Sequence, residues 1–258
     1  MSPELRTTLI VAALLVGLLG MIAAILLFLA PRSPGGSPVT LPGVTPEEAA
    51  PSWAPPADAP VASATPGAGI ATLVDADWLA STAAATGIPE RALAAYAGAA
   101  IAKAEAMPEC GISWNTIAGI GAAESDHGRH GGSAAGPDGT VTPPIYGVPL
   151  SGGEGVEHIM DSDGGAIDGD AEFDRAVGPF QLIPQTWRNW HTDGNGDGVE
   201  DPQNIDDAAM ATVNYLCRSS TAIDTEAGWR AAITAFNSPS SYLDTVAGYA
   251  VQYGEAVD

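Results

Sequence analysis

Apolar and polar positions recur with a helical period over most of the chain after residue 70. Ala-rich stretches favour helix continuation, and prolines stand where first helical turns are expected. No segment suggests a parallel sheet. We predict helices over residues 76–84, 89–106, 113–124, 184–190, 205–217 and 226–236, and a last one from 242. The pattern predicts a mainly α-helical domain over residues 70–258.

Residues 128–174 interrupt this pattern with a Gly- and Asp-rich stretch of little periodicity. It predicts a long irregular loop insertion in the helical domain. A run of acidic residues lies near its end, namely Asp161, Asp163, Asp168, Asp170 and Asp174. A solvated acidic loop is the simplest interpretation of this run, and a second ion site is the alternative.

Residues 9–30 carry no charge, and at ~1.5 Å per residue such a helix crosses a bilayer core of ~30 Å. The segment predicts a single membrane helix that acts as a signal anchor, with residues 1–8 as a short cytoplasmic tail. A cleaved signal peptide is the alternative, but the apolar run exceeds the usual ~7–15 residues. We expect the rest of the chain on the extracytoplasmic side of the cell membrane.

Residues 31–69 are rich in Pro, Ala, Gly, Ser and Thr and have almost no aromatic side chain. Such a composition cannot bury a core. It predicts a disordered linker that holds the helical domain away from the bilayer. A Pro-rich ligand for a partner domain is the alternative.

The chain is strongly acidic, with a net charge of −22 and nine Lys and Arg residues in total. Phosphate contacts need clustered Lys and Arg, so we expect no nucleic-acid partner. An anionic polymer would have to be held by groove shape and hydrogen bonds.

Glu124 is the first candidate for chemistry. It follows Ile117, Ile120 and Gly121 at the i, i+3, i+4, i+7 spacing of one helix face, which predicts an inward-pointing carboxyl. Poor solvation raises the pKa of a carboxyl, so Glu124 can act as a general acid near neutral pH. The simpler alternative is an ordinary helix-end Glu beside Ser125 and Asp126.

Short motifs in a fixed order surround this acid: Glu-Ser-Asp-His-Gly-Arg at 124–129, Asp-Arg-Ala-Val-Gly-Pro-Phe-Gln at 174–181, and Ala-Phe-Asn at 235–237 with Tyr242 beyond. Together they resemble the lytic murein transglycosylases of the membrane-bound B type, in their actinobacterial form. The resemblance covers about residues 75–254 and implies a lysozyme-like α-helical fold.

The resemblance also implies the reaction. Glu124 would protonate the oxygen of the bond between N-acetylmuramic acid and N-acetylglucosamine, then take a proton from the muramoyl C6 hydroxyl, leaving a 1,6-anhydro end. Ordinary glycosidases use two carboxylates instead. A water-using muramidase with a second Asp from 161–174 is therefore one alternative, and a weakly active peptidoglycan-binding protein is another.

Substrate-binding residues are carried over in the same way. Gln181 and Asn237 would bind sugar acetamido groups through their amides. Ser125 would hold the catalytic carboxyl, Gly178 would bring backbone close to the groove, and Phe180 would offer a ring face, with core packing as its alternative. This chain departs from the family where Phe236 replaces the usual Tyr, and we expect Tyr146 or Tyr242 to supply the missing hydroxyl.

Two cysteines, Cys110 and Cys217, complete the chemistry of the domain. Two cysteines in an exported protein usually pair, which predicts a structural disulfide; two buried thiols are the alternative.

Residues 193–201 match the first part of a calcium loop, with oxygen donors at alternate positions. The expected ligands are Asp193, Asn195, Asp197, the Val199 carbonyl and Asp201. Position twelve is Asn204 where the pattern requires Glu. A structural calcium ion and a plain acidic turn both remain open, and the chemistry itself requires no cofactor.

Overall fold

The computed structural model describes residues 51–62, 68–153 and 155–257. The predicted tail at 1–8 and the predicted membrane helix at 9–30 lie outside these residues, as do residues 31–50 and 63–67 of the predicted linker. Within the described ranges, no helix combines the length and apolar character needed to cross a bilayer.

The described chain is mainly α-helical, as predicted, with seven α-helices and only two very short strands. The α-helices are α2 (Ala76–Thr86), α3 (Glu90–Ala106), α4 (Trp114–Ser125), α5 (Pro184–Trp190), α6 (Ile205–Ser219), α7 (Glu226–Phe236) and α8 (Ser240–Glu255). The short elements are the 3-10 helices η1 (Ile70–Leu73), η2 (Pro108–Cys110) and η3 (His130–Gly132) and the antiparallel strands β1 (Ala134–Ala135) and β2 (Val141–Thr142). Each predicted helix is present, with ends close to those expected.

Local capping explains these ends. The Asp75 carboxylate accepts hydrogen bonds from the backbone N–H groups of Asp77 and Trp78 at the start of α2. Gly87 ends the same helix in the left-handed conformation, at a φ of 73°. Asn204 and Thr225 cap α6 and α7 in the same manner as Asp75 caps α2.

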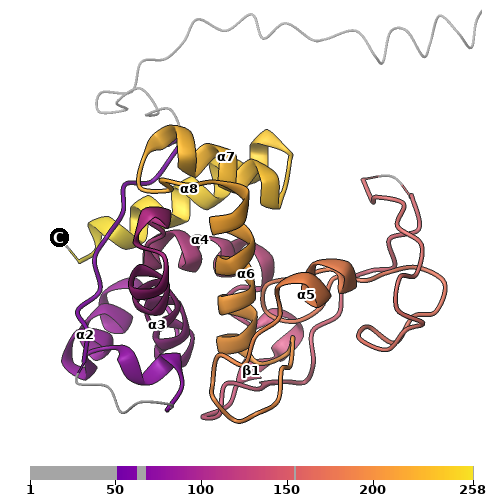
Figure 1. Cartoon of the computed structure of the whole chain (residues 1–258), viewed down its shortest axis with the longest axis horizontal. Coiled ribbons are helices and arrows are strands. Elements are labelled where there is room, and N and C mark those ends of the chain that lie inside the picture. The colour runs from indigo at the N-terminus through magenta and orange to yellow at the C-terminus, as the bar shows by residue number, and fades with distance from the viewer. Residues whose placement is uncertain (1–50, 63–67, 154, 258) are drawn as a thin grey trace, which may run out of the picture. The chain divides into compact units, whose positions relative to one another are not determined.

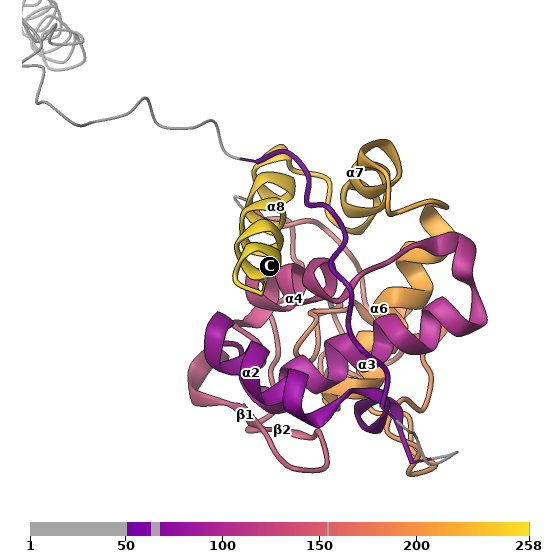
Figure 2. The same cartoon turned by 90° about the vertical axis from the view of Figure 1, so that its left-hand side faces the viewer.

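Helix α4 lies in the core, between α3 and α8 (Figure 2). Gly119 permits the close approach of α8, because a Cβ there would lie 2.8 Å from the Val246 carbonyl oxygen. Trp114 and Trp229 are fully buried, and the Trp229 indole donates to the Thr116 hydroxyl at 3.0 Å. Packing on both sides therefore fixes the position of α4 and of Glu124 in its last turn.

Most of residues 143–175 form an irregular excursion beside α5 (Figure 1), as the lack of periodicity predicted. Arg188 of α5 donates to the Ser162 carbonyl at 2.8 Å and ties this excursion to the helices. A solvated acidic loop is the wrong description for Asp168 and Asp174, which are 5% and 0% exposed. Asp174 instead accepts hydrogen bonds from the backbone N–H and the hydroxyl of Ser162.

Cys110 and Cys217 form a disulfide between η2 and α6, which confirms the predicted pairing. The two cysteines are 107 residues apart in sequence. A cross-link over a loop of that length restricts the unfolded chain and contributes ~4–5 kcal/mol in the chain-entropy model.

Residues 51–62, here called the strap, belong to the folded unit. In Figure 2 the strap runs from the α8 side toward α3 and η1. Its carbonyl groups at Ser52, Pro55 and Asp58 accept hydrogen bonds from side chains of the helices, and Ala54 is 1% exposed. The prediction of a disordered linker over residues 31–69 is therefore wrong for the strap. Proline has no backbone N–H, but its carbonyl still accepts hydrogen bonds, and the donors here are side chains of the helices.

Asn115, at the start of α4, is the centre of these contacts. Its side-chain amide donates to the Pro55 carbonyl at 2.8 Å and to the Ala250 carbonyl of α8 at 3.1 Å, and its oxygen accepts from the Ala57 N–H. Asn115 is 1% exposed. One buried side chain thus joins the strap, α4 and α8.

Replacing Asn115 by Ala is expected to lower the free energy of unfolding by about 2–4 kcal/mol, because several buried polar groups lose their partners. Urea denaturation of the full-length chain measures this loss. The exposed Asn189 of α5 gives the matched control: Asn189→Ala should change stability by less than about 0.5 kcal/mol. Equal stability of the two variants would show that the buried contacts of Asn115 contribute nothing to the stability of the fold.

Candidate active site

Glu124 occupies the last turn of α4, and its helix face is buried as predicted. Ile117 and Ile120 are both 0% exposed, and the Glu124 side chain is half-buried. Burial raises the pKa of Glu124 from 4.5 to about 7, and a hydrogen bond from Tyr242 opposes this rise in part. A substantial fraction of the carboxyl is therefore protonated at neutral pH.

Tyr242, in the first turn of α8, is the hydrogen-bond partner of this acid. Its phenol donates to Glu124 Oε1 at 2.6 Å. Burial, and then the neighbouring Glu124 carboxylate, raise the pKa of Tyr242 well above its ordinary value, so the phenol stays a neutral donor. Its ring stacks on Phe236 at 6.3 Å between centroids. Of the two tyrosines predicted to supply the hydroxyl missing at Phe236, the structure places Tyr242 on the acid.

Ser125 does not hold the Glu124 carboxyl, contrary to expectation. The Ser125 hydroxyl donates to the Pro179 carbonyl at 2.6 Å and accepts from the Gly128 N–H at 2.8 Å. The side chain is 2% exposed, which also leaves it no access to substrate. Ser125 instead joins the end of α4 to the loop that carries Gln181.

Gly178 and Phe180 are likewise structural rather than groove residues. Gly178 is buried at a φ of 73°, and a Cβ there would collide with the Pro202 carbonyl oxygen. Phe180 is 0% exposed and packs edge-on against Tyr96 at 5.7 Å. The alternative of core packing is thus correct for Phe180, and neither residue has a surface to offer a sugar.

Gln181 and Asn237 keep accessible amides. Gln181 is half-buried at a φ of 47°, and its amide donates to the Gly178 carbonyl at 2.9 Å, which leaves donor and acceptor capacity. Asn237 is exposed at the C-terminal cap of α7, and the Phe236 ring beside it stacks on Tyr242. Hydrogen bonds and packing thus bring the three motifs together around Glu124.

A buried histidine behind the acid has no counterpart among the predicted residues. His127 is 3% exposed; its Nδ1 lies 3.3 Å from the Tyr96 hydroxyl and its Nε2 lies 3.0 Å from the Tyr253 hydroxyl. Burial lowers the pKa of His127 to about 4, so the ring is neutral at neutral pH. The residue links α3, the turn after α4, and α8. Only spatial proximity reveals this role, because the three residues are far apart in sequence.

The five expected calcium ligands lie in a loop that is held by its own hydrogen bonds. The Asp193 carboxylate accepts from the N–H groups of Gly196, Asp197 and Gly198, and Val199 is 61% exposed. The remaining donors, Asn195, Asp197 and Asp201, also accept backbone hydrogen bonds of their own turns. The loop is held by protein contacts, and calcium binding stays a prediction on which no catalytic step depends.

Asp207, outside the predicted set, organises that loop. Its buried carboxylate accepts hydrogen bonds from the N–H groups of Gly194, Asn195 and Asp201. Burial is the main cause that raises the pKa of Asp207 to about 6. Asp207 of α6 therefore fixes the loop to the helix, although it is not one of the expected calcium ligands.

Within the described part of the chain, one acidic trio brings its ligand atoms within 4.8 Å of one another: Asp161, Asp163 and Asp174. The carboxylates already accept backbone N–H groups, including those of Gly164, Gly165 and Ser162. These bonds stabilise the ionised carboxylates without an ion.

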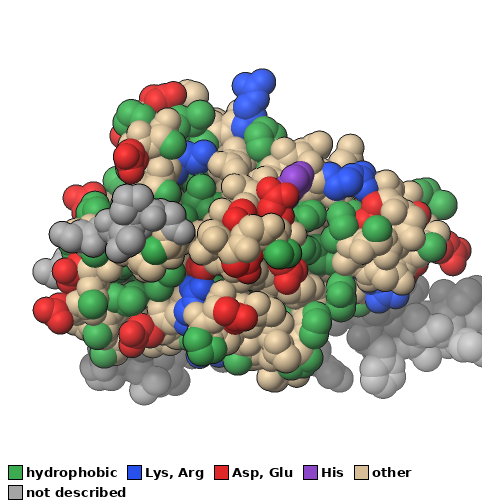
Figure 3. Space-filling model, turned by 60° about the horizontal axis from the view of Figure 1, so that its bottom comes forward, with side chains coloured by type: hydrophobic (Ala, Val, Ile, Leu, Met, Phe, Trp, Pro, Cys, Tyr) green, Lys and Arg blue, Asp and Glu red, His purple; other side chains and the backbone are tan. Residues whose placement is uncertain are grey.

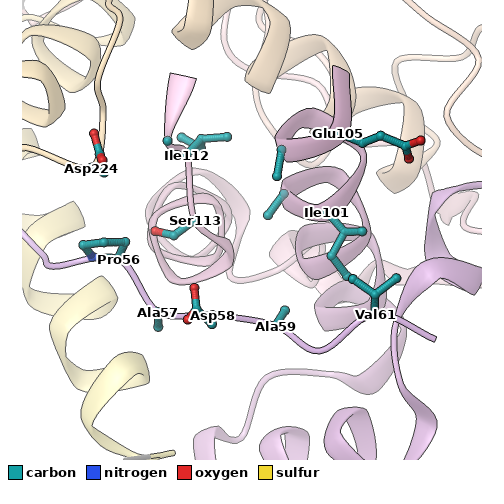
Figure 4. A pocket seen from close by; sticks show the side chains of 13 residues that line it. Pro56, Ala57, Asp58, Ala59, Val61, Ile101, Glu105, Ile112, Ser113 and Asp224 are labelled. Carbon is teal, nitrogen blue, oxygen red and sulfur yellow. The ribbon is translucent and has the colours of Figure 1, made fainter. Parts of the chain in front are cut away.

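A cavity of about 520 Å³ lies away from the acid, between the strap and α3 (Figure 4). It is lined by apolar side chains such as Ile101 and Ile112 and reaches Ser113, which precedes the first residue of α4. Glu124 is at the other end of that helix. Acidic side chains spread over the face shown in Figure 3, in keeping with the net charge of −22.

The fold and the site define a helical protein in which a desolvated carboxylic acid, Glu124, accepts a hydrogen bond from a neutral phenol. Comparisons of the chain with protein-family models, curated proteins and solved structures find no match. Function is therefore inferred from the motifs of this chain and from their geometry.

Replacing Tyr242 by Phe is expected to raise the pKa of Glu124 further above about 7, because the carboxylate loses its donor. Hydrogen bonds to charged groups are worth ~1.5–3 kcal/mol, which corresponds to a rise of about one to two pH units. Titration of the side-chain carboxyl carbons by NMR measures the pKa of Glu124. The Glu124 signal is assigned as the one that is missing from the spectrum of Glu124→Gln. Tyr249→Phe, on the same helix, should leave the titration unchanged.

Glu124→Gln is expected to stabilise the protein in a pH-dependent manner. The folded pKa of Glu124, about 7, exceeds its ordinary value of 4.5, so wild-type stability falls as pH rises through this window. The variant should match wild type near pH 4 and exceed it by up to about 3 kcal/mol at pH 8. Urea denaturation at both pH values checks this, with the exposed Glu105→Gln as control. A constant difference at both pH values would contradict a raised pKa.

Proposed function

We propose that this chain is a peptidoglycan lytic transglycosylase with a lysozyme-like fold and with Glu124 as its single acid and base. The observation that carries the proposal is the half-buried Glu124 carboxyl, whose pKa is raised to about 7 and whose Oε1 accepts a hydrogen bond from the neutral Tyr242 phenol at 2.6 Å. A group that must first donate and then accept a proton works best with a pKa near the working pH.

In the first step, protonated Glu124 donates to the oxygen of the linkage between N-acetylmuramic acid and N-acetylglucosamine. The bond from the muramoyl C1 to that oxygen breaks, and the N-acetylglucosamine leaves as an alcohol. The Tyr242 hydroxyl donates to Oε1 of Glu124, so the other oxygen, Oε2, carries the proton that is transferred. The hydrogen bond from Tyr242 also stabilises the carboxylate that forms.

In the second step, the Glu124 carboxylate accepts the proton of the muramoyl C6 hydroxyl while the C6 oxygen bonds to C1. This closes the 1,6-anhydro ring and returns Glu124 to its protonated form. No water is consumed. Positive charge that develops at C1 is stabilised by the carboxylate and by the substrate's own N-acetyl group.

The surroundings of Glu124 favour this one-carboxylate route over a muramidase. Burial and Tyr242 account for the pKa of Glu124, with no contribution from a neighbouring carboxylate among the described residues. The nearest acidic residue in sequence, Asp126, is exposed and pairs with Arg129 at 2.6 Å. Aspartates 161, 163, 168, 170 and 174 accept backbone or Ser and Arg hydrogen bonds.

Gln181 and Asn237 are the proposed contacts to the sugar acetamido groups, because each has an accessible amide on a segment that neighbouring residues join to the end of α4 or to Tyr242. Peptidoglycan strands are the proposed substrate, with the domain held outside the cytoplasmic membrane by the N-terminal helix. The Cys110–Cys217 disulfide agrees with an oxidising compartment.

The test is mass spectrometry of soluble products from purified peptidoglycan treated with the full-length chain. We expect anhydromuramoyl products from wild type and a loss of at least about 100-fold in Glu124→Gln, in line with removal of a general acid. Activity should decline above about pH 7, where Glu124 becomes ionised.

Reducing muramoyl ends would instead establish a water-using muramidase. Equal products from wild type and Glu124→Gln would remove Glu124 from the chemistry. No products from a folded wild-type chain would favour a peptidoglycan-binding protein. Denaturation curves of both proteins confirm that the comparison is between folded chains.

A further inference from the structure

The cavity of about 520 Å³ beside the N-terminal end of α4 takes no part in the proposed reaction, since Glu124 lies in the last turn of that helix (Figure 4). Its volume is within the ~300–1,000 Å³ that binding pockets usually have. The strap, α3, residues 111–113 and Asp224 line it. This cavity, here called the strap pocket, is therefore a candidate for a second binding site.

The walls of the strap pocket are fixed by contacts to the rest of the fold. On one side, the Trp114 indole donates to the Asp58 carbonyl of the strap at 3.2 Å. On another, the Ile223 N–H donates to the carbonyl of the disulfide-bonded Cys110 at 2.7 Å, which holds the loop that carries Asp224. Walls held in this way are prearranged, and a ligand loses little free energy in ordering them.

The centre of the strap pocket is apolar. Ile101 and Ala104 of α3 line it together with Ile112, which is 6% exposed. Val61 of the strap is 65% exposed and extends this apolar surface to the edge of the pocket. A continuous apolar surface inside a hollow indicates a groove that another molecule covers.

The charged side chains at the edge of the pocket are all acidic among the described residues that line it: Asp58, Glu105 and Asp224. They belong to three separate segments, and each is exposed. Ion pairs of the described chain, such as Arg91–Asp206, use other carboxylates. An apolar centre with a polar edge is the anatomy of a protein interface.

The sign of this charge decides the kind of partner. A second copy of the chain is disfavoured, because each copy has a net charge of −22. Anionic polymers and anionic lipid headgroups meet the same repulsion. A small amine would pair with carboxylates that are open to water, where an ion pair contributes little. A peptide segment with an apolar side chain next to Lys or Arg matches both the apolar centre and the acidic edge.

We propose that the strap pocket docks a segment of a partner protein in which an apolar side chain is flanked by Lys or Arg. The apolar side chain enters between the strap and α3, and the basic groups pair with Asp58, Glu105 and Asp224. Glu124 stays open to its own substrate, because it lies at the other end of α4. Docking then holds the domain beside its partner without altering the reaction.

The experiment selects random dodecapeptides, displayed on phage, on the full-length chain. Enriched sequences are synthesised and their affinity is measured by isothermal titration calorimetry. We expect them to contain Lys or Arg beside an apolar side chain, and to bind more weakly as salt rises. The triple variant Asp58→Asn, Glu105→Gln and Asp224→Asn should weaken binding by roughly tenfold and reduce its salt dependence.

Two matched controls separate the pocket from the overall charge. The triple variant Asp77→Asn, Glu172→Gln and Glu226→Gln removes the same charge from exposed positions outside the pocket and should keep the affinity. Val61→Ser tests the apolar edge and should weaken binding by roughly fivefold. Val148→Ser changes a side chain that is 63% exposed outside the pocket and should have no effect.

The proposal fails if no peptide is enriched, if the enriched peptides have no basic residue, or if they bind the pocket variants and wild type equally. Urea denaturation checks that each variant is folded; lost binding with lost stability would show a structural role for the three carboxylates and also overturn it. The variant at Asp58, Glu105 and Asp224 should release anhydromuramoyl products as wild type does. Absence of these products from both proteins would remove the proposed function and leave the docking result intact.

Discussion

The hydrogen bond between Tyr242 and Glu124 is the contact on which the site depends. It joins the last turn of α4 to the first turn of α8 at 2.6 Å. Its geometry requires these helices to pack closely, and the absence of a side chain at Gly119 permits this. The same packing removes water from Glu124 and raises its pKa to about 7. The close packing of α4 and α8 thus determines both the position of the Glu124 carboxyl and its raised pKa.

The helices were predictable because their signals are local. Caps at Asp75, Asn204 and Thr225 and the proline at the start of α5 act on neighbouring backbone groups, so the sequence nearby contains all that is needed. The inward direction of Glu124 followed from Ile117 and Ile120 for the same reason. The cysteine pairing was predictable for another reason, since only two cysteines were present.

The strap was mispredicted because its order comes from distant side chains. A segment of Pro and Ala has few donors and little apolar surface of its own, and its composition correctly indicates that it cannot form a core. Asn115, Trp114 and Arg230 nevertheless donate to its carbonyl groups. Composition describes what a segment can do alone, and it does not describe the donors that the rest of the chain presents to it.

The residue types within a motif also did not reveal which side chains are buried supports and which are exposed to a ligand. Ser125, Gly178 and Phe180 all lie in motifs of the site, yet each is buried and stabilises the loop that carries Gln181. Side-chain direction there depends on the φ angles of 73° at Gly178 and 47° at Gln181, which no periodicity encodes.

Helix α8 contacts the core, the turn after α4 and the acid. Near its C-terminal end, Ala250 receives a hydrogen bond from Asn115, which also binds the strap, while its first turn presents Tyr242 to Glu124. Tyr253 of the same helix reaches His127, in the turn that follows Glu124. The phenol that tunes the acid is therefore held by contacts along the whole helix, and Asn115 connects one of them to the strap, which composition assigned to the linker. A helix fixed along its length keeps a donor within hydrogen-bond distance of one oxygen, and this is what a carboxyl that gives and then takes a proton requires.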